Sequence, residues 1–185
     1  MHVLIILIIP LLMILDYYLT LWGALLRMCT FGKHIVIQSY ELNPIFQRAI
    51  NNFKIINMQH LVFVLIVTTL FLIINHLNGL ATSFGSALVG YFIITYATIN
   101  ARHCANIFTF WYACKHPESM SGIVMLNDKM SITMSMNTLM LSLFPVASIA
   151  IATFSSFAFG GTIGIILLIA QHAYWRSKYT KELNA

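Results

Sequence analysis

The sequence predicts an all-α protein with a single membrane domain over residues 1–185. It is expected to hold about five transmembrane helices and one amphipathic helix at the membrane interface. The first observation is composition, because 59% hydrophobic and 8% charged residues lie far from the ~25% charged residues of soluble domains. The second is charge placement, because 55–101 and 130–175 contain no Asp, Glu, Lys or Arg. Each interval is about twice the ~20 residues that cross ~30 Å of hydrocarbon, which predicts two helical hairpins.

The ten basic residues predict the orientation of the chain. They form three clusters: Arg27, Lys33, Arg48 and Lys54; Arg102, Lys115 and Lys129; and Arg176, Lys178 and Lys181. Because Lys and Arg are enriched in cytoplasmic segments, the N-terminus is expected outside and the C-terminus in the cytoplasm. The expected location is the plasma membrane of a prokaryote or the inner membrane of an organelle. The bilayer is the expected partner, and no nucleic-acid motif accompanies the basic charge.

The first helix is expected over about 3–28, with one acid inside its apolar run. Asp16, Thr20, Gly23 and Arg27 are spaced four, three and four residues apart, so they lie on one helical stripe. An ionised Asp facing lipid costs ~2.5–3.5 kcal/mol, so the stripe is expected to face other helices near mid-membrane. Asp16 is therefore either a packing hydrogen-bond partner or part of a functional site.

The next segment, about 29–54, is expected to contain the amphipathic helix. Asn43 suits an N-cap and Pro44 suits the first helical position. One face after Pro44 is apolar (Ile45, Phe46, Ala49, Ile50, Phe53) and the other is polar (Arg48, Asn51, Asn52, Lys54). Glu41 is the only acid of this segment. It is either a solvated surface acid or a candidate site residue at the cytoplasmic face. Asn43 is a second candidate site residue there.

The second and third helices are expected over about 57–77 and 86–112, joined by a turn at 78–83. The third is the more polar helix, since Tyr96, Asn100, His103 and Asn106 share one face. This face is the natural partner of the Asp16 stripe. It serves either a polar path or the hydrogen bonds that hold membrane helices together at ~0.6–2 kcal/mol each.

The segment of about 113–129 gathers further side chains that can act in chemistry. His116 and Glu118 are candidates at the cytoplasmic face, and Cys104, Cys114 and Asp128 add donor atoms. Their spacing matches no zinc pattern, so no metal site is predicted. A haem held by His60 and His103 remains an alternative, since both histidines lie toward cytoplasmic helix ends. No cofactor is assigned.

The last two helices are expected over about 130–153 and 161–175. The fourth carries small hydroxyl residues and four methionines, which favour close packing, and Pro145 in its outer half. The fifth begins at Gly160-Gly161, and Gly160 and Gly164 form a small-xxx-small helix contact.

Asp16 with Thr20, followed after one crossing by Glu41-x-Asn43-Pro44, resembles a pattern in small uncharacterised integral membrane proteins of bacteria and archaea. The resemblance covers about the first quarter of the chain. It implies no activity.

Two classes of function remain open, and the sequence does not decide whether the chain is an enzyme. In the first, the chain is a subunit of a larger membrane complex or a proton- or cation-coupled transport component, with a polar path through Asp16, Thr20, Tyr96, Asn100 and His103. Five helices are few for a complete carrier, so a homo-oligomer or other membrane subunits are expected. In the second, the chain is a membrane-embedded enzyme on a lipid or polar headgroup at the cytoplasmic face, with Glu41, His103, His116 and Glu118 as acids and bases and Arg48 and Arg102 holding phosphate.

Overall fold

The computed structural model describes residues 2–29, 31–37 and 39–182, so positions 1, 30, 38 and 183–185 of the predicted domain lie outside the description. It is all-helical, as predicted. Five helices are long and apolar enough to cross a membrane, which confirms the predicted number. They are α1 (His2–Arg27), α4 (Met58–His76), α5 (Ser83–Lys115), α6 (Asp128–Thr153) and α7 (Ser156–Glu182).

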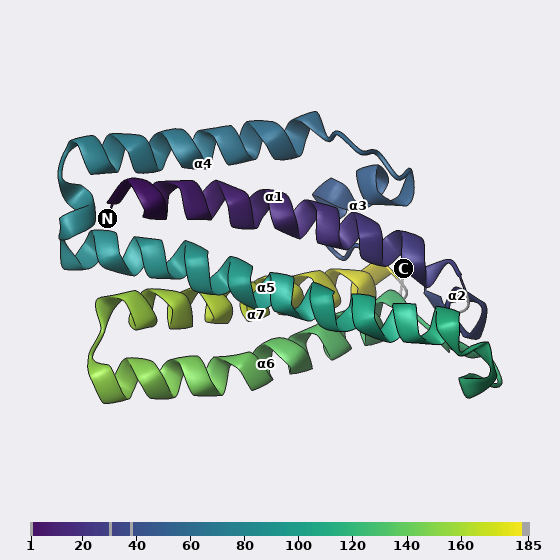
Figure 1. The fold of residues 1–185 in the computed structure, drawn as a ribbon. Helices are drawn as coiled ribbons and strands as arrows, with labels where there is room; N and C mark the ends of the chain where they lie inside the picture. Colours follow the sequence, from purple (N-terminus) through teal and green to yellow (C-terminus); the bar gives the residue numbers. More distant parts are fainter. Residues whose placement is uncertain (1, 30, 38, 183–185) are drawn as a thin grey trace.

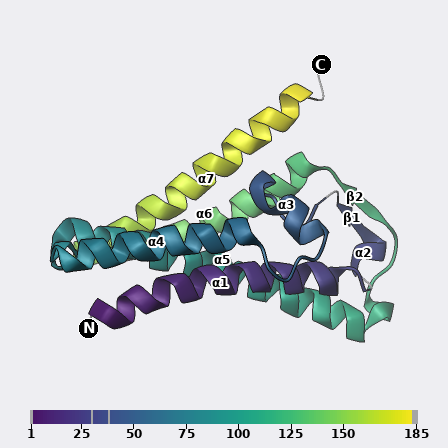
Figure 2. The ribbon, with the colours of Figure 1, turned by 90° about the horizontal axis from the view of Figure 1, so that it is seen from above.

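Helix α5 is the centre of the bundle. It packs along α1 on one side and along α7 on the other, while α4 covers α1 and α6 packs on α7. Figure 1 shows these helices lying roughly parallel, and Figure 2 shows the C-terminal part of α7 leaning away from the others. We call the end that carries α2 and α3 the charged end, and the end that carries the N-terminus the apolar end.

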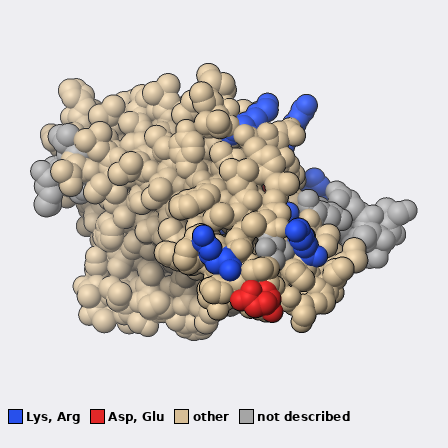
Figure 3. Space-filling model, turned by 45° about the vertical axis from the view of Figure 1, so that its right-hand side comes forward, with Lys and Arg blue, Asp and Glu red and all other residues tan. Residues whose placement is uncertain are grey.

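Charged residues gather at one end because the sequence places them at the same ends of successive helices. Arg27, Lys115 and Lys129 lie in the last or first turns of α1, α5 and α6, and these turns meet at the charged end. On the face shown in Figure 3, the charged atoms lie toward one side and the remaining described surface is uncharged. This distribution suits a protein whose middle lies in hydrocarbon.

Helix α3 (Pro44–Asn51) confirms the amphipathic helix and its start. The Asn43 side chain accepts a hydrogen bond from the Ile45 backbone N–H at 3.1 Å, as an N-cap does. Its apolar face is divided, because Ile50 is 1% exposed against Tyr17, Leu21 and Ala24 of α1 whereas Ile45 is 65% exposed. Part of the face therefore holds α3 on α1, and part is free to meet the membrane interface.

The charged end also contains short elements that the sequence does not predict. Helix α2 (Phe31–His34) leads into β1 (Ile35–Ile37), which pairs in parallel with β2 (Val124–Leu126). The 3-10 helix η2 (Pro117–Ser119) precedes β2, and His34 Nδ1 lies 2.8 Å from the Gly122 carbonyl oxygen. These contacts join the two polar segments of the chain. At the apolar end, the predicted turn holds η1 (Gly79–Ala81).

Helix α7 begins at Ser156, five residues earlier than predicted, so its glycines lie inside the helix. A Cβ on Gly160 would overlap the backbone of Ala87, and one on Gly164 would overlap the Thr95 side chain. On α5, a Cβ on Gly90 would overlap the Phe157 carbonyl. The glycines therefore mark where α5 and α7 approach most closely and not where the helix starts.

Candidate functional site

The close packing of α1 and α5 brings the two predicted polar stripes together. His103 Nε2 lies 3.3 Å from Asp16 Oδ1, the distance of an ion pair when the imidazole is protonated. The side chains are 11% and 24% exposed, respectively. An acid inside an apolar helix thus has a basic partner on the neighbouring helix, which reduces the cost of placing it there.

Thr20 completes this contact and fixes its hydrogen-bond directions. Its hydroxyl donates to the Asp16 carbonyl oxygen at 2.8 Å, so its oxygen is left to accept from His103 Nε2 at 3.1 Å. Nε2 therefore carries a hydrogen that it donates to Thr20, while Asp16 Oδ1, 3.3 Å from Nε2, accepts no hydrogen bond from the described residues. His103 Nδ1 is buried without a hydrogen-bond partner among the described residues.

Asn100 and Tyr96 continue the α5 face toward the apolar end. The Asn100 amide donates to the Leu12 carbonyl oxygen of α1 at 3.0 Å, a direct helix-to-helix bond of the kind expected for packing. Tyr96 packs against a buried apolar cluster and stacks near Phe92. That cluster consists of Ile6, Ile9, Met13, Val64, Val67, Phe71, Leu80 and Val89. The polar face thus ends at Tyr96, and apolar side chains fill the space beyond it.

Tyr40 covers the other side of His103 and was not among the predicted site residues. Its ring centroid lies 6.3 Å from that of His103, and its hydroxyl occupies the space beside Gly23, where a Cβ would overlap it. The gap on the α1 stripe is therefore filled by the loop before α3. The one feature of the sequence that could have indicated Tyr40 as a site residue is its position directly before Glu41, which was a candidate. We call Asp16, Thr20, Tyr40, Asn100 and His103 the Asp16–His103 site.

Glu41 lies at the charged end, in the loop before α3, and interacts electrostatically with Asp16. Its Oε1 accepts a hydrogen bond from the Asn43 backbone N–H at 2.6 Å. The pKa of the Glu41 carboxyl is raised to about 7, because burial and, to a smaller extent, the charge of Asp16 outweigh the hydrogen bonds to Asn43 and Leu42 and the charge of Arg102, which lower it. Asn43 therefore both caps α3 and holds this carboxyl.

His116 and Glu118 form a separate pair on the surface of the charged end. His116 Nδ1 lies 3.2 Å from Glu118 Oε1, and both side chains are largely exposed. The backbone N–H of Glu118 and the neighbouring His116 lower the pKa of the Glu118 carboxyl. Within the described part of the chain, neither residue forms a hydrogen bond or ion pair with Glu41 or Asn43. The candidates for a headgroup enzyme are thus not gathered into one site.

His60, the other residue considered for haem, packs beside α1. Its ring stacks on Tyr17 with centroids 5.0 Å apart and meets the edge of Phe46 at 5.6 Å. Over residues 2–29, 31–37 and 39–182, no three His, Cys, Asp or Glu side chains are close enough together to hold a metal ion. The ring contacts of His60 with Tyr17 and Phe46 are those of a packed aromatic residue.

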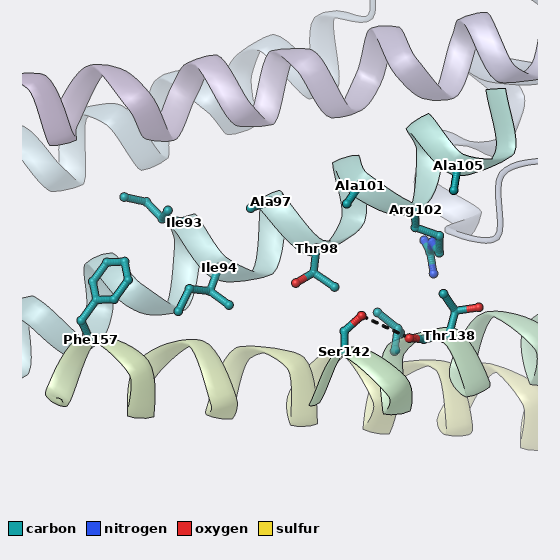
Figure 4. Close-up of a pocket in the computed structure, with 11 residues that line it drawn as sticks. Ile93, Ile94, Ala97, Thr98, Ala101, Arg102, Ala105, Thr138, Ser142 and Phe157 are labelled. Carbon is teal, nitrogen blue, oxygen red and sulfur yellow. Dashed lines mark hydrogen bonds between the residues drawn. The ribbon is translucent and has the colours of Figure 1, made fainter. Parts of the chain in front are cut away.

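Arg102 was considered from the sequence as a residue that could hold phosphate, and the structure shows where its side chain lies. It follows Ala101 on α5 and turns away from the Asp16 stripe toward α6, where its guanidinium donates to Ser135 Oγ. Figure 4 shows the Arg102 side chain directed into the gap between α5 and α6.

Comparison of the chain with protein-family models, curated proteins and solved structures found no match.

Proposed function

We propose that this chain is a membrane subunit of a proton- or cation-coupled system and that the Asp16–His103 site is where the ion is taken up. The observation that carries the proposal is the 3.3 Å contact of Asp16 Oδ1 with His103 Nε2 between two apolar helices. Paired ionisable groups inside membrane helices are costly and commonly belong to proton relays. Histidine is the side chain whose ordinary pKa suits proton exchange near neutral pH.

The hydrogen bonds favour one position for an incoming proton. Nε2 of His103 already carries a hydrogen that it donates to Thr20, so the added proton goes to Nδ1. The resulting imidazolium is stabilised by the Asp16 carboxylate. Buried polar atoms such as Nδ1, which has no partner among the described residues, commonly bind ordered water, which can deliver the proton.

The proton is expected to enter from the charged end, which we assign to the cytoplasm from its basic residues. Counted from Ser83, twenty residues at ~1.5 Å each bring His103 about 30 Å along α5, near the edge of a hydrocarbon layer. Asp16 beside it then lies closer to the headgroups than the mid-membrane depth expected from α1 alone. Glu41, with a pKa of about 7, is close enough to Asp16 for the two charges to interact, so it is the candidate to pass the proton on.

The apolar end gives no polar continuation of this route within the described residues. The apolar cluster beyond Tyr96 fills the space between α1, α4 and α5. A bundle with a one-sided site suits a subunit, either in a homo-oligomer or with other membrane proteins, better than a complete carrier. The expected behaviour of the chain alone is therefore proton uptake without sustained conduction.

The test is a rapid pH jump applied to oriented proteoliposomes on a solid-supported membrane. We expect a brief displacement current in the wild-type protein, with no sustained current. Asp16→Asn and His103→Gln should each reduce the charge moved by at least about tenfold while keeping side-chain size. Jumps in Na⁺ or K⁺ at constant pH distinguish a cation site from a proton site.

Asp128→Asn is the matched control, because it removes one carboxylate at the N-terminus of α6, away from His103. Its current should equal that of the wild type. Absence of any pH- or cation-dependent current in correctly inserted wild-type protein would refute the proposal. So would an undiminished current in both Asp16→Asn and His103→Gln.

A further inference from the structure

A cavity of about 540 Å³ lies between α5 and α6, away from the Asp16–His103 site. Helix α6 packs closely on α7 but scarcely contacts α5, so the two helices leave a groove that Phe157 of α7 closes toward the apolar end. Figure 4 shows the α5 side chains above the groove and Thr138 and Ser142 of α6 below it.

The walls of the groove are mainly apolar, and no acid among the described residues lines it. Ala97, Ala101 and Ala105 recur every fourth residue on α5, so their small side chains leave room along one face. Ile93, Ile94, Leu139 and Phe157 add larger apolar surface. The polar lining groups are Thr98, Thr138, Ser142 and Arg102.

Arg102 gives the groove a positive charge near the charged end. Its hydrogen bond to Ser135 uses one of the five N–H donors of a guanidinium, and it makes no other hydrogen bond to the described residues. The negative charges of Glu41 and Asp16 interact with the Arg102 guanidinium, but neither carboxylate lies within salt-bridge distance of it. A guanidinium placed in apolar surroundings is stabilised by a direct anionic partner, and its planar geometry matches phosphate.

The length and lining of the groove suit an acyl chain. From Ile93 to Arg102 the groove follows nine residues of α5, or about 14 Å. Its apolar walls run along this length and end at one cation, Arg102, as an acyl chain with an anionic headgroup requires.

We propose that this groove binds an anionic phospholipid of the surrounding bilayer, with its phosphate on Arg102 and an acyl chain along Ala101, Ala97 and Ile94. The charge of Arg102, the absence of lining acids and the apolar walls all complement such a lipid. The charges of Arg102 and Glu41 also interact. A phosphate bound to Arg102 would therefore act on the proposed route to the Asp16–His103 site through Glu41.

The test is native mass spectrometry of the full chain, delipidated in mild detergent and titrated with phosphatidylglycerol or with phosphatidylcholine of the same acyl chains. We expect one phosphatidylglycerol to bind about tenfold more tightly than phosphatidylcholine, the factor for a charge-assisted hydrogen bond of ~1.5 kcal/mol. Arg102→Gln should remove this preference. Arg48→Gln removes an exposed basic residue of α3 and should preserve it.

A second pair of variants tests the groove without changing charge. Ala101→Leu fills the space beside Arg102, and it should weaken phosphatidylglycerol binding by about tenfold. Ala170→Leu adds the same bulk at an exposed position of α7 outside the groove and should have no effect. Because Ala101 is exposed, its replacement is compatible with the fold, so the test stands even where Arg102→Gln fails to fold.

Three outcomes would overturn the proposal. Equal binding of the two phospholipids would show no role for the charge, and undiminished binding of phosphatidylglycerol to Ala101→Leu would place the lipid elsewhere. A dimer that Ala101→Leu disrupts, with no bound phospholipid, would show that a second copy occupies the groove.

Discussion

The hydroxyl of Tyr40 occupies the space that the missing side chain of Gly23 leaves on α1. Through this contact the loop before α3 lies over His103 and closes one side of the Asp16–His103 site. The glycine of the α1 stripe thus has a steric role in the site.

Gly23→Ala should therefore displace Tyr40 and destabilise the charged end. Its Cβ would overlap the Tyr40 ring as well as the hydroxyl, and forced overpacking typically costs ~1–3 kcal/mol. Thermal unfolding in detergent measures the loss. In a double-mutant cycle with Tyr40→Leu, the effect of Gly23→Ala should shrink by at least about 1 kcal/mol. An additive double variant would show that the contact does not limit stability.

Neutral His103 should carry its proton on Nε2 and gain the second proton on Nδ1. This follows from the Thr20 hydroxyl, whose hydrogen points to the Asp16 carbonyl and whose oxygen accepts from Nε2. Nitrogen NMR of histidine-labelled protein over a pH series reads the tautomer, and His103→Gln assigns the signal. A neutral form with the proton on Nδ1 would contradict the arrangement.

The protein should be less stable at pH 8 than at pH 5 because of Glu41. Its carboxyl has a pKa of about 7 in the folded protein and an ordinary value of 4.5, so between these pH values unfolding releases a proton. The free energy of unfolding therefore falls as pH rises from 4.5 to 7, by at most about 3 kcal/mol at 1.36 kcal/mol per pKa unit.

Glu41→Gln isolates this contribution from the histidines that titrate in the same range. The variant should lose part of the pH dependence of the thermal midpoint, whereas Glu118→Gln, at an exposed position, should retain all of it. Identical pH profiles for wild type and Glu41→Gln would show that Glu41 ionises as in solution.

Gly160→Ala should separate α5 from α7. The added methyl would overlap the Ala87 backbone, which cannot move aside as a flexible side chain can. A loss of about 3 kcal/mol is expected, at the upper end of overpacking costs. Thermal unfolding compares it with Ala170→Leu, which enlarges an exposed position of the same helix. Equal midpoints for the two variants would place the close contact elsewhere.

The sequence predicted the features that depend on periodicity and charge. The uncharged interval 55–101 gave α4 and the membrane part of α5, and Asn43-Pro44 gave the start of α3, because helix length and capping are local properties. The contact of Asp16 with His103 could also be predicted, since each residue lies on a polar stripe of an apolar helix.

The remaining features depend on contacts between distant parts of the chain. Tyr40 fills a gap on α1 that only the folded loop can reach, and Arg102 leaves the stripe because α6 offers Ser135 on the other side. The start of α7 was missed because glycine reads locally as a helix breaker, whereas Gly160 is required inside the helix by Ala87. The roles of Asp16, His103 and Glu41 in ion uptake stay predictions.

The parallel pairing of β1 with β2 has a consequence for the order of folding. Ile35 pairs with Val124, so this contact joins positions far apart in the chain, and α1, α4 and α5 must all be synthesised before it forms. Non-local pairing of this kind is slow because a long loop must close first. The β1–β2 pairing is therefore expected to form late, after α1, α4 and α5 have been synthesised, and a chain truncated before Val124 would lack it.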